Sequence, residues 1–571
     1  MGHHRAKQNK QPANTLAAQL FHYNNKLLDI LACIYALVVI VVLPMYNKMS
    51  YARIGTEKRA FFTGFLDFFS KLVLPFLILQ VILYLISVFK QHNRNLKDSM
   101  QSLCHSCNTL DLFVFCYMLS VLISYFASDY REVAVLGSPG WSMGTLVQLS
   151  MCETYFLISR FWEKRLWMVA LLLPVSCIMF ILGYFNRFGI WPIPMAANHN
   201  PQFISLAGNI NWYCGYMVLV LLGSVYLMWA GAFSKVWQQR LLTGYLLVGF
   251  AALITNGSSS GILTLAAILY ILLIMSISDL NKMLRFCKIV ILLGISCTFT
   301  LCVRLLFPNA ITYQETTNNL MTYSALPLLL LLFSTLVYVI FKYGFKRVSY
   351  PAQLFKTLLS ILTCILLFVF LLFVIFIIVN TCTPGSIGPL SSLSVFTFST
   401  EWGSRRGATW SAGAMAWWEL SPFKKLVGVG PDCMQSYLYT DAGASLSSML
   451  AAVWPSDKLA NAHCEWLTVL VNLGVLGLIS FAGMMISSIL SFFKTGLTAQ
   501  TTQTQTGQPQ AGRIRAHHTQ VKSIQADHHL VGACGLAILA YTIHNVVSFQ
   551  QILNLPTMFI LLAIGAAYRS R

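Results

Sequence analysis

Two adjacent arginines open the part of this sequence that is best suited to chemistry. They lie in Ser404–Leu420, which is predicted to be a helix because Ser404 can cap its start and Ser421-Pro422 ends it. Of the pair, Arg406 has the more informative neighbours, and Arg405 is expected to point to the flank of the helix.

Arg406 recurs with Trp410, Gly413 and Trp417 at helical spacing, so these four residues are expected to share one face. A guanidinium has planar, paired donors that match phosphate oxygens better than an ammonium group does. Exposed indole rings stack on the C–H faces of sugars, although packing explains a single tryptophan equally well. The face therefore suits phosphate and sugar groups, and the alternative is a pair of arginines that anchors the helix at lipid headgroups.

His463 is the second candidate, directly before a long apolar run. A helix N-terminus and partial burial would keep its imidazole neutral. A neutral imidazole near pH 7 is what a general base requires. By itself, a histidine at a membrane surface is unremarkable, so the prediction depends on what lies around it.

Both candidates belong to one long connection, residues 381–463. It holds five of the 18 acidic residues and five of the 13 tryptophans. A linker would not be so aromatic, because aromatic residues bury themselves or bind something. We therefore expect this connection to fold against the rest of the protein.

The remainder of the 571-residue chain has the composition of a membrane protein. It is 57% hydrophobic and only 10% charged, too little charge for a soluble protein of this length. The net charge of +20 comes from short basic clusters between apolar runs, which indicates membrane topology and argues against a nucleic-acid partner. The predicted fold class is an all-α polytopic membrane protein with about 12–14 transmembrane helices and one large extracytoplasmic loop.

Apolar runs of membrane-spanning length give about fourteen candidate helices, of which the fourth, seventh and eighth have the least certain boundaries. They are 27–46, 68–89, 110–127, 146–160, 166–184, 213–232, 241–256, 261–278, 287–307, 325–342, 357–380, 464–490, 529–549 and 553–568.

Orientation follows from the basic residues, most of which fall on alternate connections. This pattern places both termini in the cytoplasm and 381–463 outside, and one outer connection, with Lys48, Arg53, Lys58 and Arg59, goes against it. The expected organisation is a cytoplasmic N-terminus, a membrane domain, the outer loop, one helix, a disordered Thr/Gln-rich cytoplasmic linker and two final spans. Their ranges are 1–26, 27–380, 381–463, 464–490, 494–528 and 529–568.

The sequence predicts no metal and no cofactor. Cys104-His105-Ser106-Cys107 is a single C-x-x-C without the second pair that a zinc site needs. The acidic residues of 381–463 also lack ligand spacing. A disulfide between Cys382 and Cys433 is one alternative, since both are predicted to lie outside the membrane, but free thiols are the favoured interpretation.

The order of the motifs resembles the O-antigen ligase and polysaccharide polymerase superfamily. The resemblance covers about 75 residues, through the following motifs: Arg406-Gly407-x-x-Trp410, Pro422, Gly428-Val429-Gly430-Pro431, Ala462-His463 and Gly474-x-x-Gly477-Leu478. Gly208-Asn209-Ile210-Asn211 and His544-Asn545 resemble two further segments of the family. Many members have S-R-G where this chain has Ser259-Ser260-Gly261, so one cation is absent or replaced, and Arg187 and Arg304 are the candidates to replace it.

The resemblance implies glycan transfer from an undecaprenyl-diphosphate carrier to an acceptor glycan or lipid, outside the bacterial cytoplasmic membrane. Arg406 is expected to stabilise the diphosphate leaving group without a metal, with Arg405 in a secondary role. His463 is expected to act as base in a displacement that inverts the anomeric centre. Trp410, Trp417, Asn209, Arg187 and Arg304 are the candidate substrate-binding residues.

Two other functions stay open from the sequence. A lipid-linked oligosaccharide flippase needs a cationic central cavity and usually an internal repeat, and neither is visible in the sequence. A peptidoglycan-type polymerase would rely on an aspartate of the outer loop instead of His463.

Overall fold

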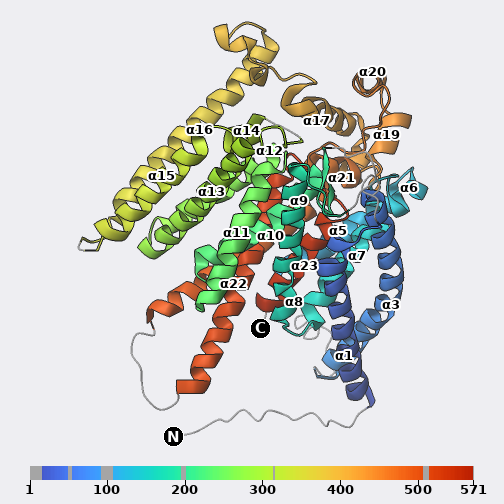
Figure 1. The fold of residues 1–571 in the computed structure, drawn as a ribbon. Coiled ribbons are helices and arrows are strands. Elements are labelled where there is room, and N and C mark those ends of the chain that lie inside the picture. The colour runs from blue at the N-terminus through green and yellow to red at the C-terminus, as the bar shows by residue number, and fades with distance from the viewer. Residues whose placement is uncertain are drawn as a thin grey trace.

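The computed structural model describes residues 16–48, 54–91, 107–193, 201–312, 316–346, 348–505 and 514–569. Over these residues the fold is almost entirely α-helical (Figure 1). The two strands, β1 (Phe203–Ile204) and β2 (Gly208–Asn209), form a short antiparallel pair in which Phe203 faces Asn209. The predicted all-α class is thereby confirmed.

Eleven helical segments of the described residues are long and apolar enough to cross a membrane, so the chain is a multi-pass membrane protein. The first combines α1 (Leu16–Leu37), the π-helical η1 (Val38–Val42) and α2 (Leu43–Met45). The others are α3 (Ile54–Gln91), α5 (Thr109–Ala127), α8 with α9 (Leu166–Ala170 and Leu172–Arg187), α10 (Ile210–Ala230), α12 (Ser259–Ser276), α13 (Leu280–Leu306), α15 with η3 (Leu326–Val339 and Ile340–Gly344), α16 (Ala352–Cys382), α21 (Glu465–Gln505) and α22 (Ile514–His544).

The other three predicted spans are helices that fall short of that length or apolarity. They are α7 (Thr145–Phe161), α11 (Val236–Thr255) and α23 (Asn554–Arg569), and α7 and α23 have only 17 and 16 residues. Every predicted span thus coincides with a helix, while the total of about fourteen crossings stays a prediction.

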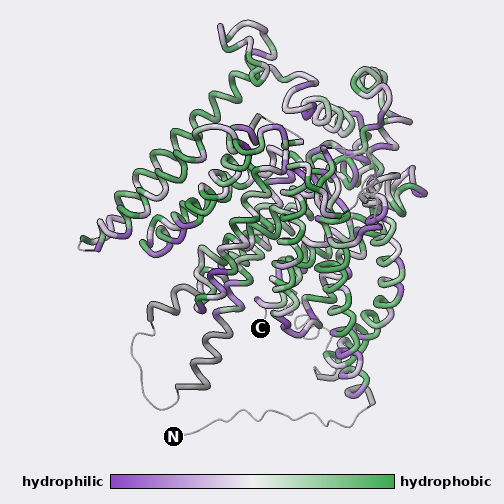
Figure 2. Tube along the Cα trace, viewed as in Figure 1, coloured by the Kyte–Doolittle hydropathy of each residue, from purple (hydrophilic) through white to green (hydrophobic). Residues whose placement is uncertain are grey.

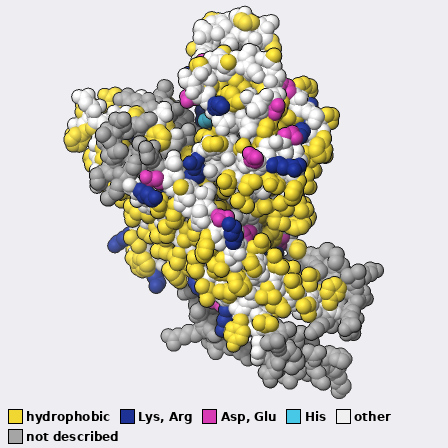
Figure 3. Space-filling view, turned by 90° about the vertical axis from the view of Figure 1, so that its right-hand side faces the viewer, with side chains coloured by type: hydrophobic (Ala, Val, Ile, Leu, Met, Phe, Trp, Pro, Cys, Tyr) yellow, Lys and Arg dark blue, Asp and Glu magenta, His cyan; other side chains and the backbone are white. Residues whose placement is uncertain are grey.

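The helices differ sharply in how much of their surface the protein itself covers. α10 is the centre of the bundle, with 89% of its most apolar window buried, whereas no residue of the corresponding window of α16 is buried. α16 has a mean hydropathy of 3.5 in that window and is hydrophobic along nearly its whole length in Figure 2, whereas α10 has 1.6. The side of the molecule seen in Figure 3 has an extended apolar surface across its middle, with charged side chains mostly above it. An apolar outer surface of this kind is suited to lipid.

The basic cluster that goes against the predicted orientation contains a lysine with a structural role. The ammonium group of Lys58 is fully buried and donates to the carbonyl oxygens of Leu43, Pro44 and Tyr46 at 2.6, 2.8 and 2.8 Å. These carbonyls lie at the end of the first span, where a helix has unsatisfied acceptors and partial negative charge. Lys58 therefore caps this helix, which gives its charge a purpose other than setting topology.

Residues 383–464 form a small folded region, which we call the cap region. It contains the 3₁₀ turns η4 (Gly388–Ser392) and η5 (Ser394–Phe396) and the helices α17 (Trp402–Glu419), α18 (Pro422–Val427), α19 (Met434–Thr440) and α20 (Ala444–Val453). Its apolar core includes Ala134 of α6 (Arg131–Leu136) and Val471 of α21. In Figure 1 the cap region lies at the upper end of the bundle, and the start of α1 and the end of α23 lie toward the lower end.

The predicted disordered linker at 494–528 differs from the structure. α21 continues to Gln505 and α22 begins at Ile514, so helix covers all of that range except 506–513, which lie outside the described residues. Extending an existing helix requires no new nucleation, so a polar sequence can continue it. A further short helix, α14 (Thr316–Thr322), lies between the predicted spans 287–307 and 325–342.

The cap region is fastened to α21 by backbone hydrogen bonds at a break in that helix. Gly474 has φ 67° and ψ −168°, which interrupts α21 and frees carbonyls one turn before it. The amide groups of Val429 and Gly430 donate to the carbonyls of Val471 and Asn472 at 3.1 and 3.0 Å. Thus the Gly-Val-Gly-Pro turn and the Gly-x-x-Gly segment, which are separate motifs in the sequence, form one junction.

Glycine is required on the helix side of this junction. A Cβ atom on Gly474 would lie 2.3 Å from the carbonyl oxygen of Leu426, and the backbone conformation is one that essentially only glycine adopts. The close approach of the two backbones therefore depends on the absence of a side chain.

We predict that Gly474→Ala destabilises the protein by at least about 1–3 kcal/mol from backbone strain alone. The matched control is Gly244→Ala in α11, where a Cβ atom would meet nothing within 4 Å and alanine should be neutral or stabilising. Thermal unfolding of the purified variants in detergent measures both effects. Equal or higher stability of Gly474→Ala would contradict this account of the junction.

Candidate functional site

Helix α17 positions Arg406, but it begins differently from the prediction. Gly403, Ser404 and Arg405 all have positive φ, so regular helix begins at Arg406 and Ser404 does not cap it. The predicted cap was wrong because left-handed conformations of serine and arginine leave no signature in the sequence. The predicted stop is confirmed, since α17 ends at Glu419.

The Arg406 side chain crosses from α17 to the segment between α22 and α23. Its Nε and one terminal nitrogen donate to the carbonyl oxygen of Val547 at 3.2 and 3.1 Å, and the other terminal nitrogen donates to Gly403 at 2.9 Å. The side chain is half-buried. Arg406 therefore links the cap region to residues 545–551, which we call the 545–551 segment.

His463 reaches the same segment from the other end of the cap region. Its ring packs edge-on against Phe549, with 4.9 Å between the ring centroids. The residue has φ 49°, and its backbone amide donates to the side chain of Asn461 at 3.0 Å. This turn lies just before α21 begins and places the imidazole against Phe549.

The electrostatics of His463 agree with the neutral imidazole that the sequence predicted. Burial and, second, the positive charge of Arg406 lower the pKa of His463 from its usual value near 6.5 to about 4. Both causes oppose protonation, so the ring is neutral at pH 7. The influence of Arg406 also shows that the two predicted residues lie close enough to act on each other.

An open apolar groove of about 370 Å³ adjoins these residues. It is lined by the following residues from the cap region, the head of α21 and the 545–551 segment: Phe398, Trp410, Ser411, Ala414, Cys464, Leu467 and Val546. The indole nitrogen of Trp410 is buried and has no hydrogen-bond partner among the described residues. Trp410 thus lies where a bound apolar or sugar group would contact it.

Trp417, predicted on the same face, does not line this groove. Its indole nitrogen donates to the carbonyl of Lys425 at 3.4 Å, and the Lys425 ammonium lies 5.5 Å from the ring centroid. The ring also packs on the core of the cap region. The structure therefore favours the packing role for Trp417, which the sequence left open.

Arg405 is not among the residues that line the groove. Its side chain is exposed and forms an ion pair with Glu401 at 3.6 Å, on the outer surface of the cap region. Such an exposed pair is free to rearrange, because its contribution to stability is small.

Arg187 is completely buried and forms hydrogen bonds to backbone carbonyl groups. Its guanidinium donates to the carbonyls of Thr255, Pro201 and Asn256 at 2.8, 3.0 and 2.5 Å. These carbonyls lie on separate segments, before β1 and between α11 and α12. The geometry therefore favours a structural role over the phosphate contact that the sequence suggested.

Arg304, the other candidate to replace the absent arginine, lies at the end of α13. It donates to the side chains of Asn319 and Thr322 at 2.9 and 2.6 Å, and its guanidinium lies 4.6 Å from the ring centroid of Tyr323. These partners are neutral, and the side chain is buried. No contact in the described residues brings Arg304 onto the 545–551 segment.

Ser260 belongs to a buried polar chain. Its hydroxyl lies 3.1 Å from Nε2 of His544 and 2.7 Å from the hydroxyl of Ser258, and Nδ1 of His544 lies 3.2 Å from the side chain of Asn545. Asn209 is further away along the chain and caps α10 by accepting from the amide of Asn211 at 2.8 Å. The serine thus helps to hold the start of the 545–551 segment.

Two aspartates of the cap region are engaged in fastening it. The carboxylate of Asp432 accepts from the amides of Ser138 and Met143 at 2.8 and 3.0 Å, and burial raises the pKa of Asp432 to about 7. Asp441 accepts a short hydrogen bond from the hydroxyl of Tyr130. Their contacts are structural, which weighs against an aspartate-based polymerase.

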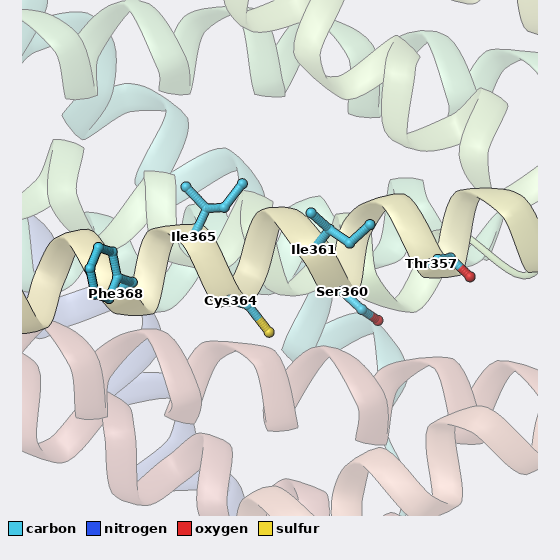
Figure 4. A pocket seen from close by; sticks show the side chains of 6 residues that line it. All are labelled: Thr357, Ser360, Ile361, Cys364, Ile365 and Phe368. Atoms are coloured by element: carbon cyan, nitrogen blue, oxygen red, sulfur yellow. The ribbon is translucent and has the colours of Figure 1, made fainter.

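The larger of the two surface pockets is not a candidate functional site. It has about 440 Å³ and is lined only by α16, through Thr357, Ser360, Ile361, Cys364, Ile365 and Phe368 (Figure 4). A single exposed apolar helix is a surface for lipid.

The described cysteines are free thiols, as the sequence favoured, with Cys382 exposed and Cys433 buried. The C-x-x-C motif at 104–107 falls mostly outside the described residues, and Cys107 is exposed. Among the described residues no group of three or more His, Cys, Asp or Glu side chains is arranged to hold a metal ion, and the predicted independence from metal stays a prediction.

Sequence reasoning missed two parts of this arrangement, the 545–551 segment and Glu465. His544-Asn545 is the only sequence signal near the first, and Glu465 belongs to none of the motifs. The fold and the site define a multi-pass membrane protein whose cap region brings an arginine and a histidine to one membrane-domain segment. No protein-family model matches the chain, and comparison with curated proteins finds no match.

We predict that Arg187→Lys lowers the thermal stability, because one ammonium group cannot replace the three hydrogen bonds that the guanidinium makes to carbonyls on two separate segments. Each buried acceptor left unpaired costs about 1–3 kcal/mol. Arg405→Lys is the control and should change stability by less than about 0.5 kcal/mol, because it alters only an exposed pair. Unchanged stability of Arg187→Lys together with weaker binding of a lipid diphosphate would instead restore Arg187 as a phosphate ligand.

Proposed function

We propose that this chain is a membrane-embedded glycosyltransferase of the O-antigen ligase and polymerase type. It would move or polymerise a glycan from an undecaprenyl-diphosphate carrier onto an acceptor hydroxyl of a glycan or lipid. The observation that carries the proposal is the meeting of Arg406 and His463 on the 545–551 segment, beside an apolar groove.

The arrangement supplies a base for the acceptor hydroxyl and a positive charge for the diphosphate leaving group. The acceptor oxygen attacks the anomeric carbon while the bond from that carbon to the diphosphate oxygen breaks, which inverts the centre. His463 takes the proton of the acceptor hydroxyl and later releases it to water. Undecaprenyl diphosphate leaves with the bonding electron pair, and the positive charge of Arg406 stabilises it. Trp410 and the groove would contact the sugar or the first prenyl units.

A pKa near 4 makes His463 a weak base in the free protein, and substrate binding removes one cause of that weakness. The diphosphate brings negative charge next to Arg406, which offsets the repulsion between the guanidinium and an imidazolium. The pKa of His463 then rises toward neutrality. The base therefore becomes effective when the donor lipid is present.

The proposed location is the bacterial cytoplasmic membrane, with the cap region outside and both termini in the cytoplasm. This orientation rests on the distribution of lysine and arginine in the sequence. It is supported by the position of the cap region at the end of the bundle opposite to the start of α1 and the end of α23 (Figure 1).

We predict that His463→Ala lowers transfer by about 10²–10⁴-fold, the usual contribution of a general base. Arg406→Lys should lower it by about 10-fold or more, because lysine lacks the paired donors that match a phosphate. Purified protein would be given a synthetic undecaprenyl-diphosphate oligosaccharide with either a second such molecule or a saccharide-bearing lipid as acceptor. Mass spectrometry of the products measures transfer and separates polymerase from ligase.

Arg405→Lys is the matched control and should retain most of the activity. A folded His463→Ala protein with normal transfer would rule out the base. Carrier lipid that crosses the bilayer of a proteoliposome without any new glycosidic bond would favour a flippase.

We predict that kcat/KM declines on the acidic side only at an unusually low pH. Because burial and Arg406 both depress the pKa of His463, kcat/KM should stay level as the pH falls to about 5 and decline only near 4. Arg406→Gln removes the second cause, so its acid limb should move to higher pH, whereas Arg406→Lys keeps the charge and should keep the low limb. Half-maximal kcat/KM near pH 6.5 in the unaltered protein would contradict the assignment, because that is the behaviour of an unperturbed imidazole.

A further inference from the structure

Glu465, at the first position of α21, forms two hydrogen bonds to the backbone of the 545–551 segment. The amide of Glu465 donates to the carbonyl of Asn545 at 2.9 Å. Its carboxylate accepts from the amide of Gln550 at 2.6 Å. A single residue thus bonds to the backbone near both ends of the segment.

Both predicted catalytic contacts fall between these two bonds. Val547, whose carbonyl receives Arg406, and Phe549, whose ring supports His463, lie between Asn545 and Gln550. A shift of the segment would therefore displace the guanidinium and the imidazole together. At the start of the segment, the contact between His544 and Ser260 adds a further hold.

The burial of Glu465 shows that this arrangement has a cost. The side chain is completely buried, and its second carboxylate oxygen has no hydrogen-bond partner among the described residues. Burying a carboxyl group that is only half satisfied is unfavourable, so a purely structural contact would be better served by a neutral side chain. Such a residue is typical of a site where geometry is maintained at the expense of stability.

We propose that Glu465 is a positioning residue that sets Arg406 and His463 relative to each other through the 545–551 segment. The catalytic part of this inference rests on the proposed glycosyl transfer. The positional part does not, because it concerns how tightly His463 is held whatever the reaction is.

Two variants separate the effect of the position of the 545–551 segment from the effect of the charge on Glu465. Glu465→Gln keeps an acceptor for the Gln550 amide and should stay within about threefold of the normal kcat. Glu465→Ala removes the acceptor and should lower kcat by about 10- to 100-fold with less effect on KM, because small displacements of reacting groups have effects of this size. Phe549→Leu, which loosens His463 and leaves the carboxylate in place, should reproduce the loss if Glu465→Ala does not fold.

Asp111→Ala is the matched control. Asp111, at the start of α5, is also a buried carboxyl group that accepts a backbone amide, that of Asn108 at 2.9 Å, and no interaction among the described residues joins it to Arg406, His463 or the 545–551 segment. It should lower thermal stability and leave kcat per folded molecule unchanged. If Glu465→Ala behaves in the same way, Glu465 is merely structural and the inference is overturned.

A readout without catalysis distinguishes this inference from the proposed function. Diethyl pyrocarbonate modifies neutral imidazole, and mass spectrometry of peptides gives the rate at each histidine. His463 should react roughly tenfold faster in Glu465→Ala, the equivalent of about one lost hydrogen bond, and at the normal rate in Glu465→Gln and Asp111→Ala. The exposed His22 serves as an internal reference.

The possible results have separate meanings. Faster modification of His463 in Glu465→Ala, without glycan transfer by any form of the protein, would support the positioning role and refute the glycosyltransferase. Transfer by the unaltered protein with an unchanged His463 rate and unchanged kcat in both Glu465→Ala and Phe549→Leu would refute the positioning role alone.

Discussion

The hydrogen bonds between the Gly428–Gly430 turn and the broken helix α21 are the contacts on which the rest of the site depends. A membrane helix normally satisfies its own backbone, and a break is tolerated only where other groups take up the freed carbonyls. Here the turn of the cap region does so. Because α21 begins at Glu465, two residues after the predicted base, the same helix fixes the cap region and the position of His463. The glycines are needed at this point, since the two backbones approach too closely for side chains.

Cations in this protein have different roles that their sequence neighbourhoods do not reveal. Lys58 caps the first span, and Arg187 binds carbonyls of separate segments in the interior. Arg406 also binds carbonyls, yet it is half-buried beside an open groove and its charge acts on His463. What distinguishes the proposed ligand-binding arginine is therefore its partial exposure next to residues that line the groove, whereas Arg187 is completely buried. This distinction supports Arg406 over Arg187 as the residue that meets a lipid diphosphate.

The sequence predicted the helices well because apolar runs of membrane length have few other uses, and each run coincides with a helix. It also singled out Arg406 and His463, since their residue types and motifs carry chemical meaning. It could not identify the 545–551 segment, because that segment contributes a backbone carbonyl and a phenylalanine ring, and neither has a distinctive pattern. Glu465 was missed for a related reason: its partner is a backbone amide that is distant in sequence. The left-handed residues before Arg406 and the separate roles of Trp410 and Trp417 likewise emerge only from tertiary packing.

The central claim is that Arg406, His463 and the 545–551 segment form one site for a lipid diphosphate. Photo-crosslinking tests it most directly, with a polyprenyl diphosphate that carries a diazirine next to the diphosphate and with the full-length protein in lipid nanodiscs. Peptide mapping by mass spectrometry should place the label on the start of α17 and on residues 545–551, and excess unlabelled lipid diphosphate should suppress it. Label confined to the surroundings of Arg304, or spread over the lipid-facing helices without competition, would contradict the account.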